Sequence, residues 1–440
     1  EISLMNIFRG AIGLCFIVSI AYAFSADRKN IDWRLVASGI FIQLVIGLLI
    51  AKVAIIGSFF GFISDKFVHF LNFALGGAEF LFGDLAKNSD QASDAKHSLG
   101  FLFAFQALPI IVFFSSITAG LYYLGILQKI VWAFAWLMSK TMRLSGAESV
   151  SVAGNIFLGQ TEAPLLVRPF IAKMTSSELN CLMTGGMATL AGSVLSAYVV
   201  FLGGADPESQ TLFATYLVSA SVMNAPAAIV MSKMFLPEAT PEKIDQSIKV
   251  NKEQLGVNLI DALSKGATDG VKLVLNIGGM LLAFIAIILA INWILMDGIG
   301  AVTGLNAYVI VSTQGAFEGF SLQYILGQVF RLFAFAIGIN WSESLLVGSL
   351  LGQKFVINEF VGYLSLAEMK ASGVLSERAI MISTYALCGF ANLSSIGIQI
   401  GGIGVMAPER RGDLSLLGFR ALIGASLATL MTAAIAGAIF

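Results

Sequence analysis

Two glutamates of this chain stand in strongly apolar surroundings. Glu162 occurs in GQTEAPLL, directly after Gln160 and Thr161. Glu359 occurs in INEF, directly after Asn358. An ionisable side chain in an apolar segment is costly, and inside a membrane protein it marks a ligand or ion site by default. The sequence around these glutamates must therefore show how the chain holds them.

The composition indicates an integral membrane protein. Hydrophobic residues make up 57% of 440 residues, and charged residues make up 12%, against about 25% in a soluble domain. The net charge of −1 gives no basic surface for nucleic acid. Eight charge-free windows can hold helices of about 20 residues, the length that crosses a bilayer. These predicted spans are residues 10–26, 35–51, 98–128, 179–205, 209–232, 273–296, 379–408 and 421–440.

Cysteine and histidine are too sparse for a metal centre or for nucleophilic catalysis. Cys15, Cys181 and Cys388 are scattered in apolar runs, and we expect them to be buried small residues. His69 and His97 are too few and too far apart for a metal cage. No Ser/His or Cys/His pair lies in the predicted spans, so an intramembrane enzyme is disfavoured.

The basic residues of the loops predict the orientation. Lys and Arg gather in 27–34, 129–146, 237–272 and 407–412, whereas 203–208 carries acids and no base. Basic loops face the cytoplasm. Eight crossings then leave both termini outside the cytoplasm, in a multi-pass protein of the membrane.

Residues 55–96 fit neither a loop nor a span. Aromatic and aliphatic residues recur there near helical spacing, with charged residues between them. This pattern is typical of an amphipathic helix that lies at the membrane interface and supports the bundle.

Residues 127–176 and 322–375 resemble each other. In each copy the dipeptide LQ precedes a glutamate, Glu148 or Glu343, by the same separation. An odd number of predicted spans lies between the copies, so the second copy should be inverted, as in secondary transporters. Apolar composition alone can mimic a weak repeat, and chance similarity is the alternative. The prediction divides the chain into four parts. Residues 1–126 hold the first spans and the interfacial segment, residues 127–236 form the first repeat, residues 237–321 form a linker with one span, and residues 322–440 form the second repeat.

The limbs of each copy are too short to cross a bilayer. Limbs 149–161 and 163–173, like 344–358 and 360–370, have about a dozen residues, or roughly 18–20 Å of helix. They should form two re-entrant hairpins, with Gln160–Glu162 at one tip and Asn358–Glu359 at the other. Irregular backbone at membrane depth requires protein or a water-filled cavity beside it.

Three alternatives concern these tips and the spans that follow them. Glu162 could be an acid of a surface loop, and Lys354 could pair with Glu359 as a structural lock, since buried charges seek partners. The spans after the hairpins are rich in Gly, Ser and Thr in residues 185–198 and 388–404. Such helices pack closely, but the same residues permit unwinding in mid-span, where backbone carbonyls can bind a polar solute or Na⁺.

Three motifs carry a resemblance that covers essentially the whole chain. GQTEAPLL, INEFVGY and CGFANLSSIGIQIGGIG resemble the concentrative nucleoside transporter family in its bacterial branch. The resemblance implies an all-α membrane protein with eight transmembrane helices, two opposed re-entrant hairpins and interfacial helices. It further implies a homotrimer in the bacterial inner membrane. The two repeats would form a transport domain that moves like an elevator against a scaffold formed by 1–126 and 237–321.

The resemblance also implies site residues, a substrate class and a coupling ion. Nucleosides such as uridine, cytidine and adenosine would be imported with Na⁺. The base would meet Gln160, Thr161 and Glu162; the ribose would meet Glu359, Asn392 and Ser395; and Val194 and Phe390 would pack on the nucleoside. Sodium would bind Asn155, Thr189 and the backbone carbonyls of Leu158 and Leu190.

Rival functions remain open. The family often has Ser where this chain has Thr189; the hydroxyl is kept, which favours Na⁺, but a proton-coupled nucleoside importer is an alternative. A carrier of another polar solute is a second alternative, although two acids at the site argue against an anionic substrate. A channel is disfavoured, because the hairpins would close the path from both sides.

Overall fold

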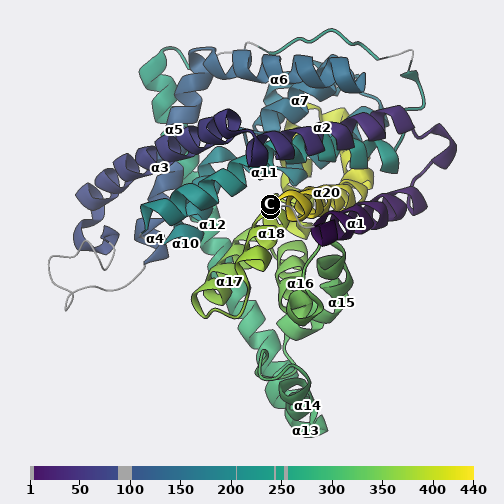
Figure 1. The fold of residues 1–440 in the computed structure, drawn as a ribbon. Coiled ribbons are helices and arrows are strands. Elements are labelled where there is room, and N and C mark those ends of the chain that lie inside the picture. Colours follow the sequence, from purple (N-terminus) through teal and green to yellow (C-terminus); the bar gives the residue numbers. More distant parts are fainter. Residues whose placement is uncertain (1–3, 88–101, 205, 242–243, 252–255) are drawn as a thin grey trace.

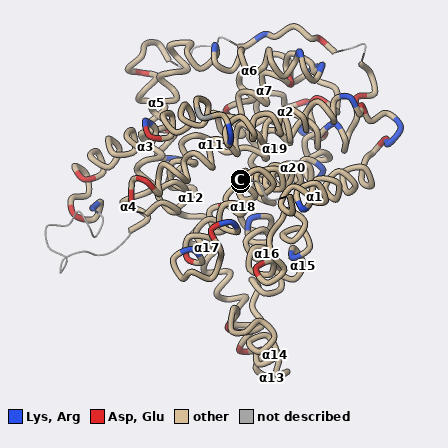
Figure 2. The backbone as a smooth tube through the Cα atoms, in the orientation of Figure 1, with Lys and Arg blue, Asp and Glu red and all other residues tan. Residues whose placement is uncertain are grey.

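The computed structural model describes residues 4–87, 102–204, 206–241, 244–251 and 256–440 (Figure 1). All regular structure in these ranges is helical, and none of them contains a strand. His97, the first residues of the predicted span 98–128 and the end of the predicted segment 55–96 lie outside the described residues. Charged residues lie mostly at helix ends and in connections, and the middle of the bundle is largely uncharged (Figure 2).

Seven helical segments of the described chain are long and apolar enough to cross a membrane, and they match seven of the eight predicted spans. They are α1 (Leu4–Ala23), α2 (Trp33–Lys52), α4 and α5 (Phe103–Gln106 and Leu108–Tyr123), α9 and α10 (Ser176–Ala188 and Gly192–Gly203), α11 (Pro207–Phe235), α12 (Leu259–Trp293) with its extension to Thr303, and α20 (Arg411–Ile439). The eighth predicted span, 379–408, is divided between α18 (Glu377–Leu387) and α19 (Leu393–Met406), and neither part is long enough alone.

Helix α12 begins fourteen residues before the predicted span 273–296, at Leu259. The charged residues that excluded this part from the prediction pair along the helix. Lys265 binds Asp261 at 2.8 Å and Lys272 binds Asp269 at 3.3 Å. Pairs at such spacing stabilise a helix, so charge ends an apolar window without ending the helix.

The predicted interfacial segment begins as the 29-residue helix α3 (Ala54–Phe82), which packs against α5 and α11. Val68 and Leu71 are buried on the packed face, whereas the aromatic rings of Phe62 and Phe73 are more than half exposed. This division between two faces is the one predicted for an amphipathic helix. Its position at the membrane interface stays a prediction.

The short limbs form two hairpins that do not cross the bundle. Hairpin 1 consists of α7 (Gly146–Asn155), the 3₁₀ turn η3 (Ala163–Val167) and α8 (Arg168–Ile171), and it follows α6 (Ile126–Met142). Hairpin 2 consists of α16 (Trp341–Val356) and α17 (Glu359–Ala371), and it follows α15 (Leu322–Ala336) after a bend of 117°. The first limb of hairpin 1 is shorter than predicted, because the chain leaves the helix after Asn155 and turns irregularly through Gly159. Pro164 is the second residue of η3, in its first turn, as expected for a residue without a backbone N–H.

Both halves of the chain therefore contain the same order of elements: a helix, a hairpin, a helix broken in its middle, and a long helix. The remaining short elements are η1 (Arg28–Asn30), η2 (Gly83–Ala86), the π-helix η5 (Ile294–Gly300), α13 (Ala301–Thr303), α14 (Leu305–Ser312) and η6 (Pro408–Arg410). The division into four domains stays a prediction.

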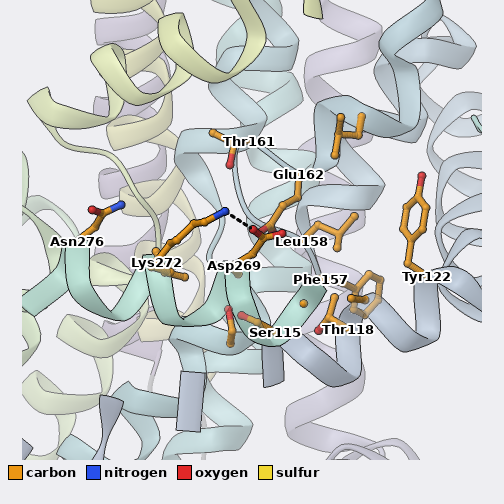
Figure 3. A pocket seen from close by; sticks show the side chains of 16 residues that line it. Ser115, Thr118, Tyr122, Phe157, Leu158, Thr161, Glu162, Asp269, Lys272 and Asn276 are labelled. Atoms are coloured by element: carbon orange, nitrogen blue, oxygen red, sulfur yellow. Dashed lines mark hydrogen bonds and ion pairs between the residues drawn. The ribbon is translucent and has the colours of Figure 1, made fainter. Parts of the chain in front are cut away.

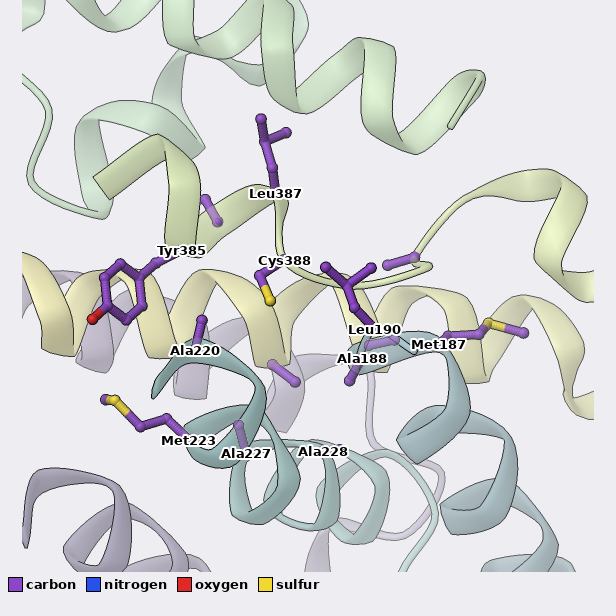
Figure 4. Packing of buried hydrophobic residues seen from close by; sticks show 14 of the residues in the cluster. Met187, Ala188, Leu190, Ala220, Met223, Ala227, Ala228, Tyr385, Leu387 and Cys388 are labelled. Atoms are coloured by element: carbon purple, nitrogen blue, oxygen red, sulfur yellow. The ribbon is translucent and has the colours of Figure 1, made fainter. Parts of the chain in front are cut away.

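The two broken helices meet in the core. Break 1 is residues 189–191, and break 2 is residues 388–392. Gly389 has a φ of +153°, and a Cβ at this position would lie 2.7 Å from the carbonyl oxygen of Ala188. The backbone N–H of Phe390 donates to the carbonyl of Thr189 at 3.3 Å. Figure 4 shows Cys388 of break 2 beside Ala188 and Leu190. The two repeats thus touch backbone to backbone.

The connection from α11 to α12 is attached to hairpin 1. The N–H of Gly146 donates to the carbonyl of Asp245 at 2.9 Å, and the N–H of Asn251 donates to the carbonyl of Leu166 at 2.8 Å. The Ser247 hydroxyl and backbone N–H donate to Asp245 and hold the pKa of this exposed carboxyl below its usual value. This part of the connection is therefore ordered by hydrogen bonds rather than by a helix.

Candidate site at the hairpin tips and helix breaks

Break 2 presents polar groups toward hairpin 2. Asn392 caps α19, since its Oδ1 accepts from the N–H of Ser395 at 2.9 Å. Its Nδ2 donates to Oε2 of Glu359 at 2.9 Å. An interrupted helix leaves backbone and capping groups without intrahelical partners. Of the two possibilities left open for these spans, the structure shows the break in mid-span in both, and at break 2 it positions an asparagine against a carboxylate.

Glu359 is the central acid of the site. It is 3% exposed, and its Oε1 accepts a hydrogen bond of 3.0 Å from the hydroxyl of Tyr198 on α10. The ion pair with Lys354, considered above as an alternative, is not formed. Lys354 Nζ instead donates to the carbonyl of Ala386 at 2.8 Å and to Oγ1 of Thr429 at 3.0 Å. The carboxylate is thus oriented by two neutral donors, and its remaining lone pairs can accept from a ligand.

The tip of hairpin 1 reaches break 2 from another direction. Gln160 is 7% exposed, and its Nε2 donates to Oγ of Ser395 at 3.2 Å. Its Oε1 has no hydrogen-bond partner in the described part of the chain. Thr161 packs against Gly402 of α19, where a Cβ would lie 2.6 Å from Thr161 Cγ2. The unsatisfied amide oxygen is available to a polar ligand.

Glu162 faces a cavity of about 410 Å³ between hairpin 1 and the helices α5 and α12 (Figure 3). Its Oε2 accepts from the N–H of Gly159 at 2.6 Å, and its side chain extends toward the ion pair of Asp269 and Lys272. Thr161 also lines this cavity. Glu162 therefore lines this cavity with an exposed side chain, unlike the buried Glu359.

These contacts bring together four of the eight predicted nucleoside-binding residues. Gln160, Ser395, Asn392 and Glu359 form a continuous chain of hydrogen bonds. Val194 is buried in the first turn of α10, and the partly buried Phe390 lies within break 2. Thr161 and Glu162 open instead onto the cavity at the other side of the hairpin 1 tip.

A second polar site lies where hairpin 1 meets break 1. Asn155 is fully buried, and neither its Oδ1 nor its Nδ2 has a partner among the described residues. A Cβ on Gly185 would lie 3.3 Å from Asn155 Nδ2, so this side chain lies beside the last turns of α9. The hydroxyl of Thr189 donates to the carbonyl of Gly185 at 2.9 Å, which leaves its oxygen lone pairs available.

The backbone of hairpin 1 is fixed to the same break. The N–H of Gly192 donates to the carbonyl of Phe157 at 3.2 Å, and the adjacent Leu158 is buried, as is Leu190 of break 1. Amide, hydroxyl and carbonyl oxygens are the ligands that a hard cation such as Na⁺ prefers. No group of His, Cys, Asp or Glu with metal-binding spacing occurs in the described residues. The donor set therefore fits an alkali cation.

Comparison with known proteins decides the family. Models of the Na⁺ dependent nucleoside transporter N-terminus and C-terminus match residues 12–85 and 216–437, and a gate domain described as "nucleoside recognition" matches residues 104–205. The chain belongs to the sodium-dependent nucleoside transporter family. An uncharacterized transporter of Haemophilus influenzae is 40% identical over 437 residues, which cover 98% of each protein.

Other members of the family extend the comparison. Sodium/nucleoside cotransporter 1 of Mus musculus is 39% identical over 97% of this chain, and the chain spans just under two thirds, 63%, of that relative. The structure of CNTnw in an inward-facing substrate-bound state has a TM-score of 0.87 at 38% identity, with 99% of both chains covered. A variant of CNTnw in an outward-facing state has a TM-score of 0.86. The relatives named for an activity are transporters, not enzymes, and the predicted all-α transporter fold is confirmed.

Sequence reasoning missed two features of this sodium-dependent nucleoside transporter family member. Tyr198 was not predicted, although it is the only tyrosine of the span 176–203 and lies one helical turn after Val194. The buried ion pair of Glu148 and Lys233 was also missed. Lys233 Nζ additionally donates to Ser177 Oγ at 2.9 Å, which ties hairpin 1 to α9 and α11. The capping pattern of Ser145 and Glu148 signals the start of α7, but it gives no sign of the pairing with Lys233.

Proposed function

We propose that the chain is a sodium-coupled symporter that imports nucleosides by alternating access. The observation that carries this proposal is the buried carboxylate of Glu359, which Tyr198 and Asn392 orient toward the meeting point of the two hairpin tips. Family membership supports the substrate class. The names of the mammalian relatives, which are sodium/nucleoside cotransporters, support the ion.

Glu359 and its neighbours recognise the ribose in this proposal. A ribose carries vicinal hydroxyl groups, and an ionised carboxylate accepts charge-assisted hydrogen bonds from such groups. Asn392 and Ser395 lie beside Glu359 and can donate to or accept from the same hydroxyls. Because the two protein donors already fix the carboxylate, little orientation has to be gained when the nucleoside binds.

The tip of hairpin 1 recognises the base. A base presents both donors and acceptors, and the amide of Gln160 and the hydroxyl of Thr161 can match either kind. The free Oε1 of Gln160 supports this role. Glu162 contacts the base in part through water from the adjacent cavity, and Val194 and Phe390 pack on the nucleoside.

Sodium binds between hairpin 1 and break 1. The oxygens of Asn155 and Thr189 and the carbonyls of Leu158 and Leu190 hold the ion, and the orphaned buried amide of Asn155 supports the assignment. A bound ion would fix the irregular turn that leads to Gln160. Ion binding would therefore raise the affinity for nucleoside, and the nucleoside would raise the affinity for the ion by the same factor.

The two repeats move together as a transport domain in an elevator-type cycle, against a scaffold of 1–126 and 237–321. The direct contact of breaks 1 and 2 supports movement of the repeats as one body. Structures of the related CNTnw represent inward-facing, outward-facing and intermediate states. The protein acts as a homotrimer in the bacterial inner membrane, with both termini outside the cytoplasm.

Uptake into proteoliposomes tests the proposal. Radiolabelled uridine and adenosine are supplied with an inward gradient of Na⁺, an inward gradient of protons, or neither. The proposal predicts saturable accumulation that depends on the Na⁺ gradient. Full uptake in choline with strong dependence on the proton gradient would establish the proton-coupled alternative, and failure to accept any nucleoside under either gradient would refute the substrate class.

A further inference from the structure

Lys354 is a buried cation that the roles above leave unused. It lies in the last turn of α16, is 4% exposed, and donates to the carbonyl of Ala386 and the hydroxyl of Thr429. It forms no ion pair with a carboxylate in the part of the chain that the structure describes. A buried ammonium that only neutral acceptors hold is expensive. Its position therefore calls for a physical reason.

The reason lies in the end of α18. Helix α18 stops at Leu387 to form break 2, and the last carbonyls of an interrupted helix have no intrahelical donors. The carbonyl of Thr384 accepts from the hydroxyl of Tyr363 at 2.9 Å, and the carbonyl of Tyr385 accepts from the N–H of Cys388 at 3.2 Å. The ammonium of Lys354 donates to the next carbonyl along the helix, that of Ala386. A cation is favoured at a helix C-terminus by the partial negative charge there.

The first repeat has the uncharged Asn155 where the second repeat has Lys354, near the end of the first limb of the hairpin. Asn155 ends the rising limb of hairpin 1 seven positions before Glu162, and Lys354 lies near the end of the rising limb of hairpin 2 five positions before Glu359. Each side chain lies beside the end of the helix that precedes its break. The C-terminal end of α9 thus has oxygens without a protein cation, whereas the C-terminal end of α18 has a protein cation.

We propose that the Lys354 ammonium is a built-in cation that holds break 2 as the sodium ion holds break 1. The inference rests on the sodium site of the proposed function. Lys354 is a positioning residue: it fixes the end of α18, and break 2 then carries Asn392 to Glu359. The second repeat therefore needs no dissociable ion, and one sodium ion per nucleoside follows from the chain itself.

Matched substitutions separate the charge of Lys354 from its volume. Lys354→Ala removes three methylenes and the ammonium, so n-propylammonium has the size and charge of the missing part. Lys354→Met removes the charge but fills most of the space. Uridine binding to the purified proteins is measured at fixed NaCl, with added n-propylammonium chloride, with added n-propanol of similar size, or with neither.

The expected result is a loss of uridine affinity of at least roughly tenfold in both variants, the scale for one hydrogen bond to a charged group. Propylammonium should restore most of the affinity of Lys354→Ala, n-propanol should not, and Lys354→Met should respond to neither. Near-normal affinity of Lys354→Met would overturn the proposal, because packing alone would then suffice. Equal rescue by n-propanol would also overturn it.

A third variant keeps the test decisive if Lys354→Ala does not fold. Thr429→Val keeps the ammonium and removes one of its acceptors, so its uridine affinity should fall less than that of Lys354→Met. A loss as large as that of Lys354→Met would contradict a dominant role for the charge. Sodium dependence is measured separately on the unsubstituted protein. A proton-driven wild type would refute the sodium assignment, whereas the amine rescue reports on Lys354 alone.

Discussion

The hydroxyl of Tyr198 donates a hydrogen bond of 3.0 Å to the carboxylate of Glu359, so a residue of the first repeat orients the central acid of the second. Both side chains are buried. Tyr198 also stacks on Tyr363 of hairpin 2, with ring centroids 4.3 Å apart. The carboxylate proposed to bind the ribose is thus held by residues of both repeats, and its geometry depends on the contact between them.

Tyr198→Phe should weaken uridine binding about three- to tenfold, less than the loss of a direct bond between ligand and charged group, because the lost hydroxyl orients the carboxylate and the ring packing is kept. The ratio of affinities for uridine and 3′-deoxyuridine should fall with it. Tyr363→Phe is the matched control, because that hydroxyl donates to the backbone of Thr384 and not to Glu359. An equal change of the affinity ratio in both variants would show that Tyr198 acts through packing.

Glu359→Gln should abolish most uptake. The neutral amide loses the charge-assisted bonds to the ribose, at a cost of about 1.5–3 kcal/mol for each contact. Initial rates of uridine uptake and competition by 3′-deoxyuridine measure the effect in wild type and variant. Uptake by the variant at the wild-type rate and affinity would remove Glu359 from ribose recognition, and equal competition by uridine and 3′-deoxyuridine in the wild type would argue the same.

Gln160→Ala should change which bases are accepted. The variant loses the amide that lies at the hairpin 1 tip with an unpaired oxygen, but it keeps the groups assigned to the ribose. The ratio of adenosine to uridine uptake is the measurement, with 3′-deoxyuridine discrimination as an internal control. A uniform loss for every nucleoside at an unchanged ratio would indicate that Gln160 only holds the tip against Ser395.

Asn155→Ala should weaken activation by sodium and leave the order of nucleoside preference intact. The measurement is initial uptake against Na⁺ concentration at fixed uridine, with choline as the replacement cation. Asn180→Ala is the control: this buried asparagine of α9 binds Ser232 and lies away from break 1. If both variants shift the sodium curve equally, the effect of Asn155 is one of helix packing.

Lys233→Met should lower the thermal stability of the detergent-solubilised protein. It leaves the buried carboxylate of Glu148 without its cation, and the loss of one partner of such a pair costs about 3–5 kcal/mol. The double variant Glu148→Leu with Lys233→Met should recover part of the loss, because the fully buried carboxylate is removed together with its cation; only Glu238, 3.9 Å from Lys233 Nζ, still loses a partner. A double variant less stable than the single one would show that Glu148 stabilises the protein even without Lys233, as through its bond to the N–H of Ser145.

The sequence predicted elements whose signals are local. Limbs too short to cross a bilayer indicated both hairpins, and glycine with serine in mid-span indicated both breaks. The search for charge-free windows placed the start of α12 too late, because ion pairs such as that of Lys265 with Asp261 keep a charged segment helical. The actual partners of Lys354 could not be read from the sequence either: the pair with Glu359 was only an alternative, and the folded chain offers the end of α18, which lies 32 positions away. Contacts over such separations, including that of Tyr198, depend on tertiary packing.

Gly389 has a consequence for how tightly ion and solute flow are linked. A side chain at this position would press on the backbone of Ala188 and force breaks 1 and 2 apart. The ion would then organise one repeat while the nucleoside met a displaced second repeat. In the proposed symport, such a protein would let sodium pass without cargo and dissipate the gradient that drives uptake. The absence of a single methyl group at Gly389 therefore keeps the ion-binding and the solute-binding repeat of the proposed transporter in contact.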